Sequence, residues 1–194
     1  MLQALASKSP TPGGGAVAAL TLALGAALAQ MVLNYSIGKK SLEAHAHIHE
    51  EALSQLQEMR DRALELADED AAAYQALNAM LRRKDDPPSV EERKETVAHA
   101  ISIPMEILQH AAKLAELLGH LAGTTNTLLD SDLAMAAILA DAAAQSACWN
   151  VRINLPALAD EADRAKARAE MDELAQRAAG AARRVQDSLR ANVK

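Results

Sequence analysis

SPTPGGG at residues 9–15 leads into an apolar run at residues 16–32, which NYSIGKK at residues 34–40 follows. Two prolines prevent a helix from running through the first segment, and the glycines allow backbone conformations that other residues avoid. We therefore expect a helix to begin near Gly14 or Gly15. Such a helix start has free N–H groups and a positive dipole end, so it suits a carboxylate, a phosphate or a polar ring edge.

The helix after the glycines is expected to be the central helix of a bundle, because it carries no charge from residue 16 to residue 38. Small and large apolar residues recur side by side every four residues along it, which allows close helix packing. These residues are Ala19, Ala23 and Ala27 beside Leu20, Leu24 and Leu28. A signal peptide or membrane span also contains an apolar run, but prolines and glycines precede this one and alanine inserts poorly into lipid. We therefore expect a cytoplasmic protein with no membrane partner.

The composition indicates a single all-α domain over residues 1–194. Half of the residues are hydrophobic, yet there is no Phe, one Trp and two Tyr, so the core must consist of Leu, Ala, Ile, Val and Met. Alanine and leucine among Glu, Arg and Lys are typical of helical proteins. The net charge of −6 argues against a nucleic-acid partner, and the single Cys148 excludes an internal disulfide.

The expected helices are long. Apolar spacing predicts a second helix over about residues 41–83, a rod of roughly 60 Å at about 1.5 Å per residue. Residues 160–193 are expected to form a last, highly charged helix. A rod of that length is more than a small monomer comfortably covers. The sequence therefore predicts an up-and-down helical bundle with long helices that forms a homodimer.

Capping residues mark the remaining helices. Ser89 and Glu92 form a capping box that opens a third helix, which is expected to end at Gly119. Asp130 or Ser131 is expected to cap a fourth, alanine-rich helix that packs closely on the first.

Acidic residues interrupt apolar helix faces at residues 68–70 and at Asp132. A carboxylate that faces a bundle interior must be paired or have a raised pKa, and it can then exchange protons near neutrality. The alternative is that the acidic triplet faces solvent and that Asp132 only complements a helix dipole.

Basic residues and histidines gather after the first helix. Lys39 and Lys40 complement the negative end of its dipole, and paired lysines also suit an anionic ligand tail. His45, His47 and His49 suggest a metal site, but a helix places only the first and last on one side and no carboxylate completes the set. We therefore expect no bound metal.

Several segments together resemble a known family, the cyclodeaminase/cyclohydrolase family, over essentially the whole chain. This family includes the cyclodeaminase domain of formiminotransferase-cyclodeaminase and the stand-alone methenyltetrahydrofolate cyclohydrolases. Tyr74 replaces the usual Phe, and GTTN at residues 123–126 replaces the usual Gly-Asn-x-Asn. The segments that carry the resemblance are SPTPGGG at residues 9–15, IGKK at 37–40, DEDAAAY at 68–74, SD at 131–132 and NVRINL at 150–155.

The resemblance implies an all-α homodimer that acts on the one-carbon bridge of tetrahydrofolate without a metal or redox cofactor. One alternative is cyclodeamination of formimidoyltetrahydrofolate, which releases ammonia and forms the 5,10-methenyl bridge. A second is hydrolysis of that bridge to 10-formyltetrahydrofolate, and a third is a non-catalytic helical scaffold. The chain lies slightly nearer the cyclodeaminase side.

Roles for individual residues are hypotheses that rest on this resemblance. Asp132 or Asp70 would stabilise the methenyl cation and relay protons, and Lys39 would act as an acid or anchor a substrate carboxylate. An enzyme requires these residues to meet at one folate-sized cleft, whereas a scaffold leaves the acids scattered. The expected substrate-binding residues are Ser9, Pro12, Gly13, Gly14, Gly15, Lys40, Asp68, Asn126, Ser131 and Asn150.

Overall fold

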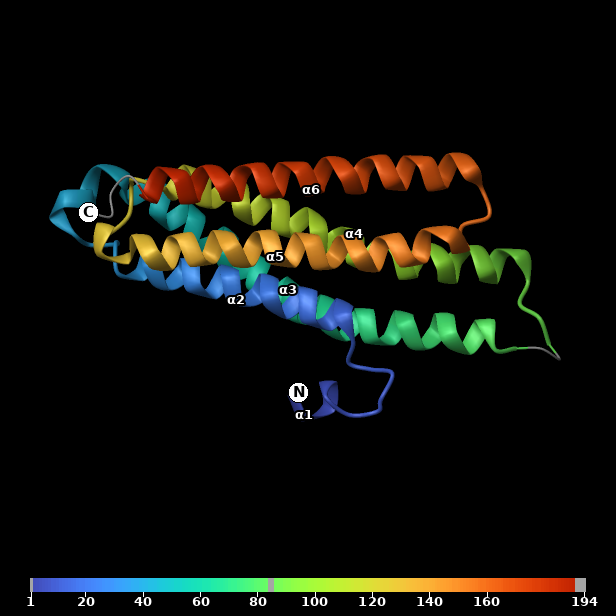
Figure 1. Cartoon of the computed structure of the whole chain (residues 1–194). Helices are drawn as coiled ribbons and strands as arrows, with labels where there is room; N and C mark the ends of the chain where they lie inside the picture. The colour runs from blue at the N-terminus through green and yellow to red at the C-terminus, as the bar shows by residue number, and fades with distance from the viewer. Residues whose placement is uncertain (1, 84–85, 191–194) are drawn as a thin grey trace.

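The computed structural model describes residues 2–83 and 86–190, and this part of the chain is helical without a strand. Five long helices run side by side, and a short N-terminal arm projects from them (Figure 1). The predicted all-α bundle is therefore confirmed. The helices are α1 (Leu2–Leu5), α2 (Gly14–Asn34), α3 (Ala46–Leu81), α4 (Val90–Leu121), α5 (Asp130–Asn154) and α6 (Glu161–Arg190), with 3₁₀ turns η1 (Lys40–His45), η2 (Thr127–Leu129) and η3 (Leu155–Ala157).

Helix α2 begins at Gly14, as predicted, and packs between α3 and α5. Its alanine ridge faces inward, because Ala19 and Ala23 are buried. Of the leucines beside it, Leu20 and Leu28 are partly buried against the core, and Leu24 is 61% exposed. By length and composition α2 is apolar enough to cross a membrane, but here most of it is buried among the other helices.

Helices α2 and α5 run antiparallel with close contact. Gly25 of α2 leaves room for α5, since an added Cβ there would lie 3.3 Å from the Leu139 Cβ atom. At one end Gly14 lies beside Asn150, and at the other end the end of α2 meets the loop before α5. The expected close packing of these two alanine-rich helices is confirmed.

Two predicted boundaries are wrong for local reasons. The second long helix begins at Ala46, because the residues after Gly38 first form the 3₁₀ turn η1. No side chain caps α5 at its Leu129 N-cap, because Asp130 is already helical and buried.

Of the other boundary predictions, the start of α4 is confirmed and its end is wrong by two residues. Ser89 caps α4, and its Oγ accepts a hydrogen bond from the Glu92 amide at 3.1 Å. That helix continues past Gly119 to Leu121. The last helix was expected to reach residue 193, and residues 191–194 lie outside the described part of the chain.

Candidate functional site

The central feature of the site is the Asp70 carboxylate of α3, which lies against the first turn of α2. A Cβ atom added to Gly15 would overlap this carboxylate, so only a glycine allows the contact. The Ala16 backbone amide donates a hydrogen bond to Asp70. An acid from another helix therefore occupies the helix start that the sequence analysis assigned to an anionic or polar ligand.

A cavity of about 290 Å³ opens beside Asp70 and is more enclosed than the larger hollows on the surface. It lies at the junction of the glycine loop with α3, α4 and α5. It is lined by Pro10, Thr11, Gly13, Gly14, Gly15, Asp70, Ala73, Tyr74, Leu77, Ala100, Asn150, Ile153 and Asn154.

Burial governs the electrostatics of this cavity. Removal from water raises the pKa of the Asp70 carboxyl above its ordinary value, and the hydrogen bond from Ala16 partly offsets this. A carboxyl in such surroundings takes up and releases a proton closer to neutral pH than a solvated one. The geometry is suited to proton transfer at the wall of the cavity.

Side-chain amides from α3 and α5 hold the cavity walls in place. Gln75 Nε2 donates to Thr11 Oγ1 at 2.9 Å, which ties the glycine loop to α3. Asn154 Nδ2 donates to the Ala100 carbonyl at 2.9 Å, which ties α5 to α4. The Asn150 amide bonds within its own helix, to the Ser146 carbonyl at 3.1 Å, and its Oδ1 lies beside Gly14.

Part of the predicted site residues meet here. Gly13, Gly14, Gly15, Asp70 and Asn150 all line the cavity. Ser9 and Pro12 belong to the same loop, where Ser9 Oγ donates to the Thr11 carbonyl at 2.7 Å. Asp68 is exposed and does not line the cavity, so of the acidic triplet it is Asp70 that faces the glycines.

The remaining predicted site residues lie at the opposite end of the bundle. The 21 residues of α2 separate the glycines from Lys39 by about 30 Å. Lys39 and Lys40 are exposed and line a second cavity of about 280 Å³ beside the buried His49. Asn126 lies at that end too, where its backbone N–H donates to Ser36 Oγ at 2.9 Å.

The start of α5 lies at the same end of the bundle (Figure 1). There Ser131 is exposed and Asp132 is half-buried. About 27 Å of α5 separates Asp132 from Asn150. Within one chain, the expected single cleft is therefore divided between two ends of the bundle.

Several residues that line the cavity were not among the predicted site residues, and helical spacing points to some of them. Leu77 lies two turns after Asp70, and Asn154 lies one turn after Asn150, so each shares a helix face with a residue that was singled out. Ile153, also on α5, is exposed at the cavity mouth.

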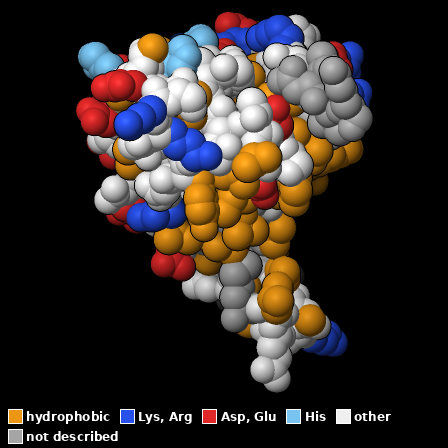
Figure 2. Space-filling model, turned by 90° about the vertical axis from the view of Figure 1, so that its left-hand side faces the viewer, with side chains coloured by type: hydrophobic (Ala, Val, Ile, Leu, Met, Phe, Trp, Pro, Cys, Tyr) orange, Lys and Arg blue, Asp and Glu red, His pale blue; other side chains and the backbone are white. Residues whose placement is uncertain are grey.

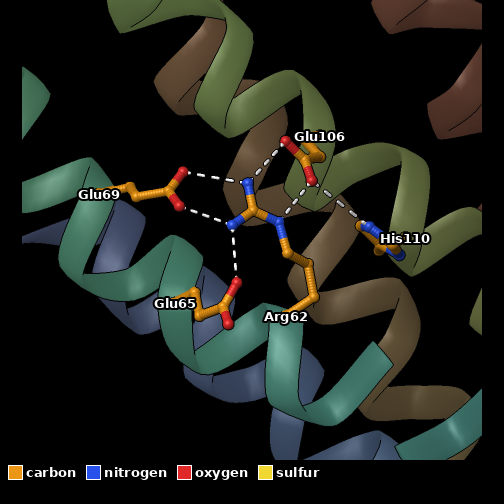
Figure 3. Close-up of polar contacts among 5 residues, drawn as sticks. All are labelled: Arg62, Glu65, Glu69, Glu106 and His110. Carbon is orange, nitrogen blue, oxygen red and sulfur yellow. Dashed lines mark hydrogen bonds and ion pairs between the residues drawn. The ribbon is translucent and has the colours of Figure 1, made fainter. Parts of the chain in front are cut away.

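A second polar cluster joins α3 to α4 on another face (Figure 3). Arg62 Nε and Nη2 donate to the Glu106 carboxylate at 2.8 and 3.1 Å, and its Nη atoms also bind Glu69 and Glu65. These bonds hold the pKa of Glu106 below its usual value, and burial lowers the pKa of the neighbouring His110. Because the guanidinium is already saturated by carboxylates, the cluster serves to join two helices.

No group of three or more His, Cys, Asp or Glu side chains is placed to hold a metal ion anywhere in residues 2–83 and 86–190. His49, one of the three histidines considered, is buried and its Nε2 donates to the Thr124 carbonyl at 2.9 Å.

Comparison with known proteins identifies relatives along nearly the whole chain. The family model described as formiminotransferase-cyclodeaminase matches residues 1–173. The formimidoyltransferase-cyclodeaminase of Sus scrofa is 34% identical over 190 residues, which cover 95% of this chain and 35% of that protein. The chain thus spans about a third of the length of the formimidoyltransferase-cyclodeaminases that it matches.

Two relatives match along most of their own length. The methenyltetrahydrofolate cyclohydrolase of Methylorubrum extorquens is 29% identical over 198 residues, which cover 99% of this chain and 95% of that protein. The crystal structure of a formiminotetrahydrofolate cyclodeaminase from Thermotoga maritima superposes with a TM-score of 0.91 at 32% identity, covering 98% of this chain and 93% of that one.

Proposed function

The chain belongs to the formiminotransferase-cyclodeaminase family, and we propose on this basis that it is a folate one-carbon enzyme with formimidoyltetrahydrofolate cyclodeaminase activity. The observation that carries the proposal is the Asp70 carboxyl, held against Gly15 and Ala16 at the wall of an enclosed cavity.

The proposed reaction requires one internal proton transfer. Starting from the protonated formimino group, the anilinic nitrogen of the folate attacks the formimino carbon and a new C–N bond forms. The proton of the attacking nitrogen passes to the former imino nitrogen. The bond from carbon to that nitrogen then breaks, ammonia leaves, and the cationic 5,10-methenyl bridge remains.

Asp70 is suited to carry that proton. Its ionised form accepts the proton from the attacking nitrogen, and its neutral form donates it to the leaving nitrogen, which requires a pKa nearer neutrality than that of a solvated aspartate. In its ionised form the carboxylate also faces the cationic carbon centre that develops during the reaction.

The rest of the cavity is suited to hold a polar ring. The backbone of Gly13, Gly14 and Gly15 approaches closely because no side chain intervenes, and the Oδ1 atom of Asn150 offers an acceptor beside it. Tyr74, Leu77 and Ile153 provide apolar surface for a flat ring. The proposed steps use proton transfer and charge stabilisation, and none of them draws on a metal or redox cofactor.

Methenyltetrahydrofolate cyclohydrolase activity is the second candidate. It is supported by the similarity to the methenyltetrahydrofolate cyclohydrolase of Methylorubrum extorquens, which is 29% identical over 99% of this chain. In that reaction water attacks the methenyl carbon and the ring opens. Asp70 would then accept a proton from the attacking water.

The two candidates are separated by following the absorbance of the methenyl chromophore with purified protein. We expect the chromophore to appear from formimidoyltetrahydrofolate together with released ammonia. Loss of absorbance from methenyltetrahydrofolate, without the first activity, would establish the cyclohydrolase instead. No change with either folate would reject both and leave a non-catalytic scaffold.

A matched pair of variants links the activity to the site. We expect Asp70→Asn to lower kcat by about 100-fold or more, the usual contribution of a general acid-base residue. Asp68→Asn changes an exposed neighbour in the same helix and should retain activity within about twofold. Equal activity of the two variants would reject the role of Asp70.

A further inference from the structure

Helix α4 contains a proline in its interior. Pro104 is buried, and because a proline nitrogen carries no hydrogen, it cannot donate to the carbonyl four residues earlier, which is that of Ala100. The proline ring also crowds this carbonyl. The Ala100 carbonyl is therefore left without the partner that an α-helix normally supplies, and a buried carbonyl of this kind needs another donor.

A side chain of α5 takes the place of the missing donor. Asn154 Nδ2 donates to the Ala100 carbonyl at 2.9 Å, across the contact where α4 and α5 run side by side (Figure 1). Because a carbonyl can only accept, this bond decides which way the Asn154 amide is turned. Its nitrogen faces Ala100, and its Oδ1 atom is the acceptor end that remains for a ligand.

Asn150, one turn earlier on α5, is oriented in the same sense. Its Nδ2 atom donates to the Ser146 carbonyl at 3.1 Å, which leaves its Oδ1 atom as the acceptor end. Both asparagines line the cavity, and so does the Asp70 carboxylate. Three side chains thus present oxygen acceptors at the cavity wall.

Positive charge does not balance these acceptors. No lysine or arginine is among the described residues that line this cavity. The other end of the bundle differs, because Lys39 and Lys40 line the cavity there, and Figure 2 views that end with Lys and Arg side chains beside hydrophobic ones. A wall of oxygen acceptors without a cation favours a ring that presents N–H donors over an anion.

We infer that Asn154 binds the substrate through its Oδ1 atom, and that Pro104 is a positioning residue that frees the Ala100 carbonyl to orient the Asn154 amide. The inference rests on the proposed function for the identity of the ligand, which is the aminopyrimidinone ring of the folate. That ring carries an amino group and an adjacent ring N–H. These two donors match the acceptor oxygens of Asn154 and Asn150.

The fixed orientation of the amide gives the wall its selectivity. An asparagine amide that turns freely offers either its oxygen or its nitrogen, so it binds ring donors and ring acceptors alike. An amide held by a main-chain carbonyl offers its oxygen without first being ordered, which removes part of the entropic cost of binding. A ring that presents an acceptor to this oxygen leaves both groups unpaired and is rejected.

Pro104→Ala tests the role of the proline, because it restores a main-chain N–H at residue 104. The Ala100 carbonyl can then bond within α4, and the hold on Asn154 is weakened. We expect the Kd for tetrahydrofolate, measured by anaerobic calorimetry, to rise about five- to tenfold, the worth of one hydrogen bond. Tm should not fall, since alanine favours a helix interior over proline. Pro87→Ala, the same change at an exposed proline before α4, should bind like wild type.

A double variant shows whether Pro104 acts through Asn154. Asn154→Ala alone should weaken tetrahydrofolate binding by about tenfold, because it removes the acceptor itself. Adding Pro104→Ala to it should change the affinity little further, since the amide that the proline orients is gone. Wild-type affinity in Pro104→Ala, or two effects that multiply in the double variant, would overturn the inference.

The orienting bond is also measured without a folate. In NMR spectra of protein with isotope-labelled asparagine, the Asn154 side-chain amide is assigned as the signal that Asn154→Ala removes. Its bond to Ala100 should shift one amide proton downfield in wild type and in Pro87→Ala, and this shift should be lost in Pro104→Ala. An unchanged signal in Pro104→Ala would overturn the role of the proline. A wild type with this signal that neither binds tetrahydrofolate nor acts on either folate would reject the proposed function and leave the orientation of Asn154 intact.

Discussion

The Asp70 carboxylate occupies the space that a side chain at Gly15 would fill, so a residue on α3 and a residue on α2 define one wall of the cavity together. The contact joins positions far apart in the sequence. Because Gly15 lies in the first turn of α2, the carboxylate also satisfies an otherwise free helix amide, that of Ala16.

Gly15→Ala should displace this carboxylate and lower kcat by about 100-fold, as the loss of Asp70 itself would, because the added Cβ overlaps the acid. Gly14→Ala is the matched control. Its Cβ would lie 3.4 Å from the Asn150 Oδ1 atom, a contact that the side chain can accommodate, so activity should fall no more than about tenfold. Steady-state kinetics on both variants measure the effect, with circular dichroism to verify helicity. Equal activity of Gly15→Ala and Gly14→Ala would contradict the importance of the contact between Gly15 and Asp70.

The raised pKa of Asp70 predicts a specific dependence of stability on pH. Because the folded-state pKa lies above the unfolded value, the folded protein holds this proton more tightly, and the resulting stability is present at low pH and lost as pH rises through the folded pKa. Asp70→Asn should therefore raise Tm by a few degrees at pH 7 and leave it unchanged near pH 3. Thermal unfolding at both pH values measures this, with the exposed Asp68→Asn as a control that should show no such difference.

Two asparagines one turn apart on α5 should behave differently. Asn154→Ala removes an interhelical hydrogen bond to the Ala100 carbonyl and should lower the free energy of unfolding by about 1 kcal/mol. Asn150→Ala removes a bond within its own helix, so stability should stay within about 0.5 kcal/mol while KM rises. Denaturant unfolding and kinetics separate the two effects, and an equal loss of stability in both variants would be inconsistent with these bonds.

The Arg62 cluster should contribute stability only while its carboxylates are ionised. Arg62→Met leaves three glutamates together without a cation and should lower Tm by several degrees at pH 7. Arg62 lowers the folded-state pKa of Glu106, so this contribution is present above the ordinary glutamate pKa and is lost as pH falls through the folded value. The difference from wild type should therefore shrink below about pH 4.

Arg177→Met provides the comparison for this cluster. This substitution breaks a single exposed ion pair between Arg177 of α6 and Glu116 of α4. It should lower Tm much less than Arg62→Met. Equal shifts for the two arginine variants in calorimetry would show that the cluster adds nothing beyond one surface ion pair.

The local features of the fold were predictable from the sequence. The glycines and prolines of residues 9–15 set the start of α2, and Ser89 with Glu92 set the start of α4. Each helix start depends on interactions between residues that are only a few positions apart, so the sequence alone predicts it. The all-α class was predictable for a similar reason, since alanine and leucine at helical spacing predict helices that pack on one another.

The distance between Lys39 and the glycine loop also follows from the sequence. A straight helix from Gly14 to Asn34 necessarily separates its ends by about 30 Å. The resemblance to a family indicates which residues share a function. It does not indicate where each of them lies along the bundle.

Only the tertiary structure decided which acid meets the glycine loop. Asp68 and Asp70 are the same residue type two positions apart, and the rotation of α3 against α2 exposes the first and places the second on Gly15. That rotation is set by the packing of many apolar side chains across the whole α2–α3 contact, a sum over residues distant in sequence. The same packing decided that the alanine ridge of α2 is buried and that Leu24 is left uncovered.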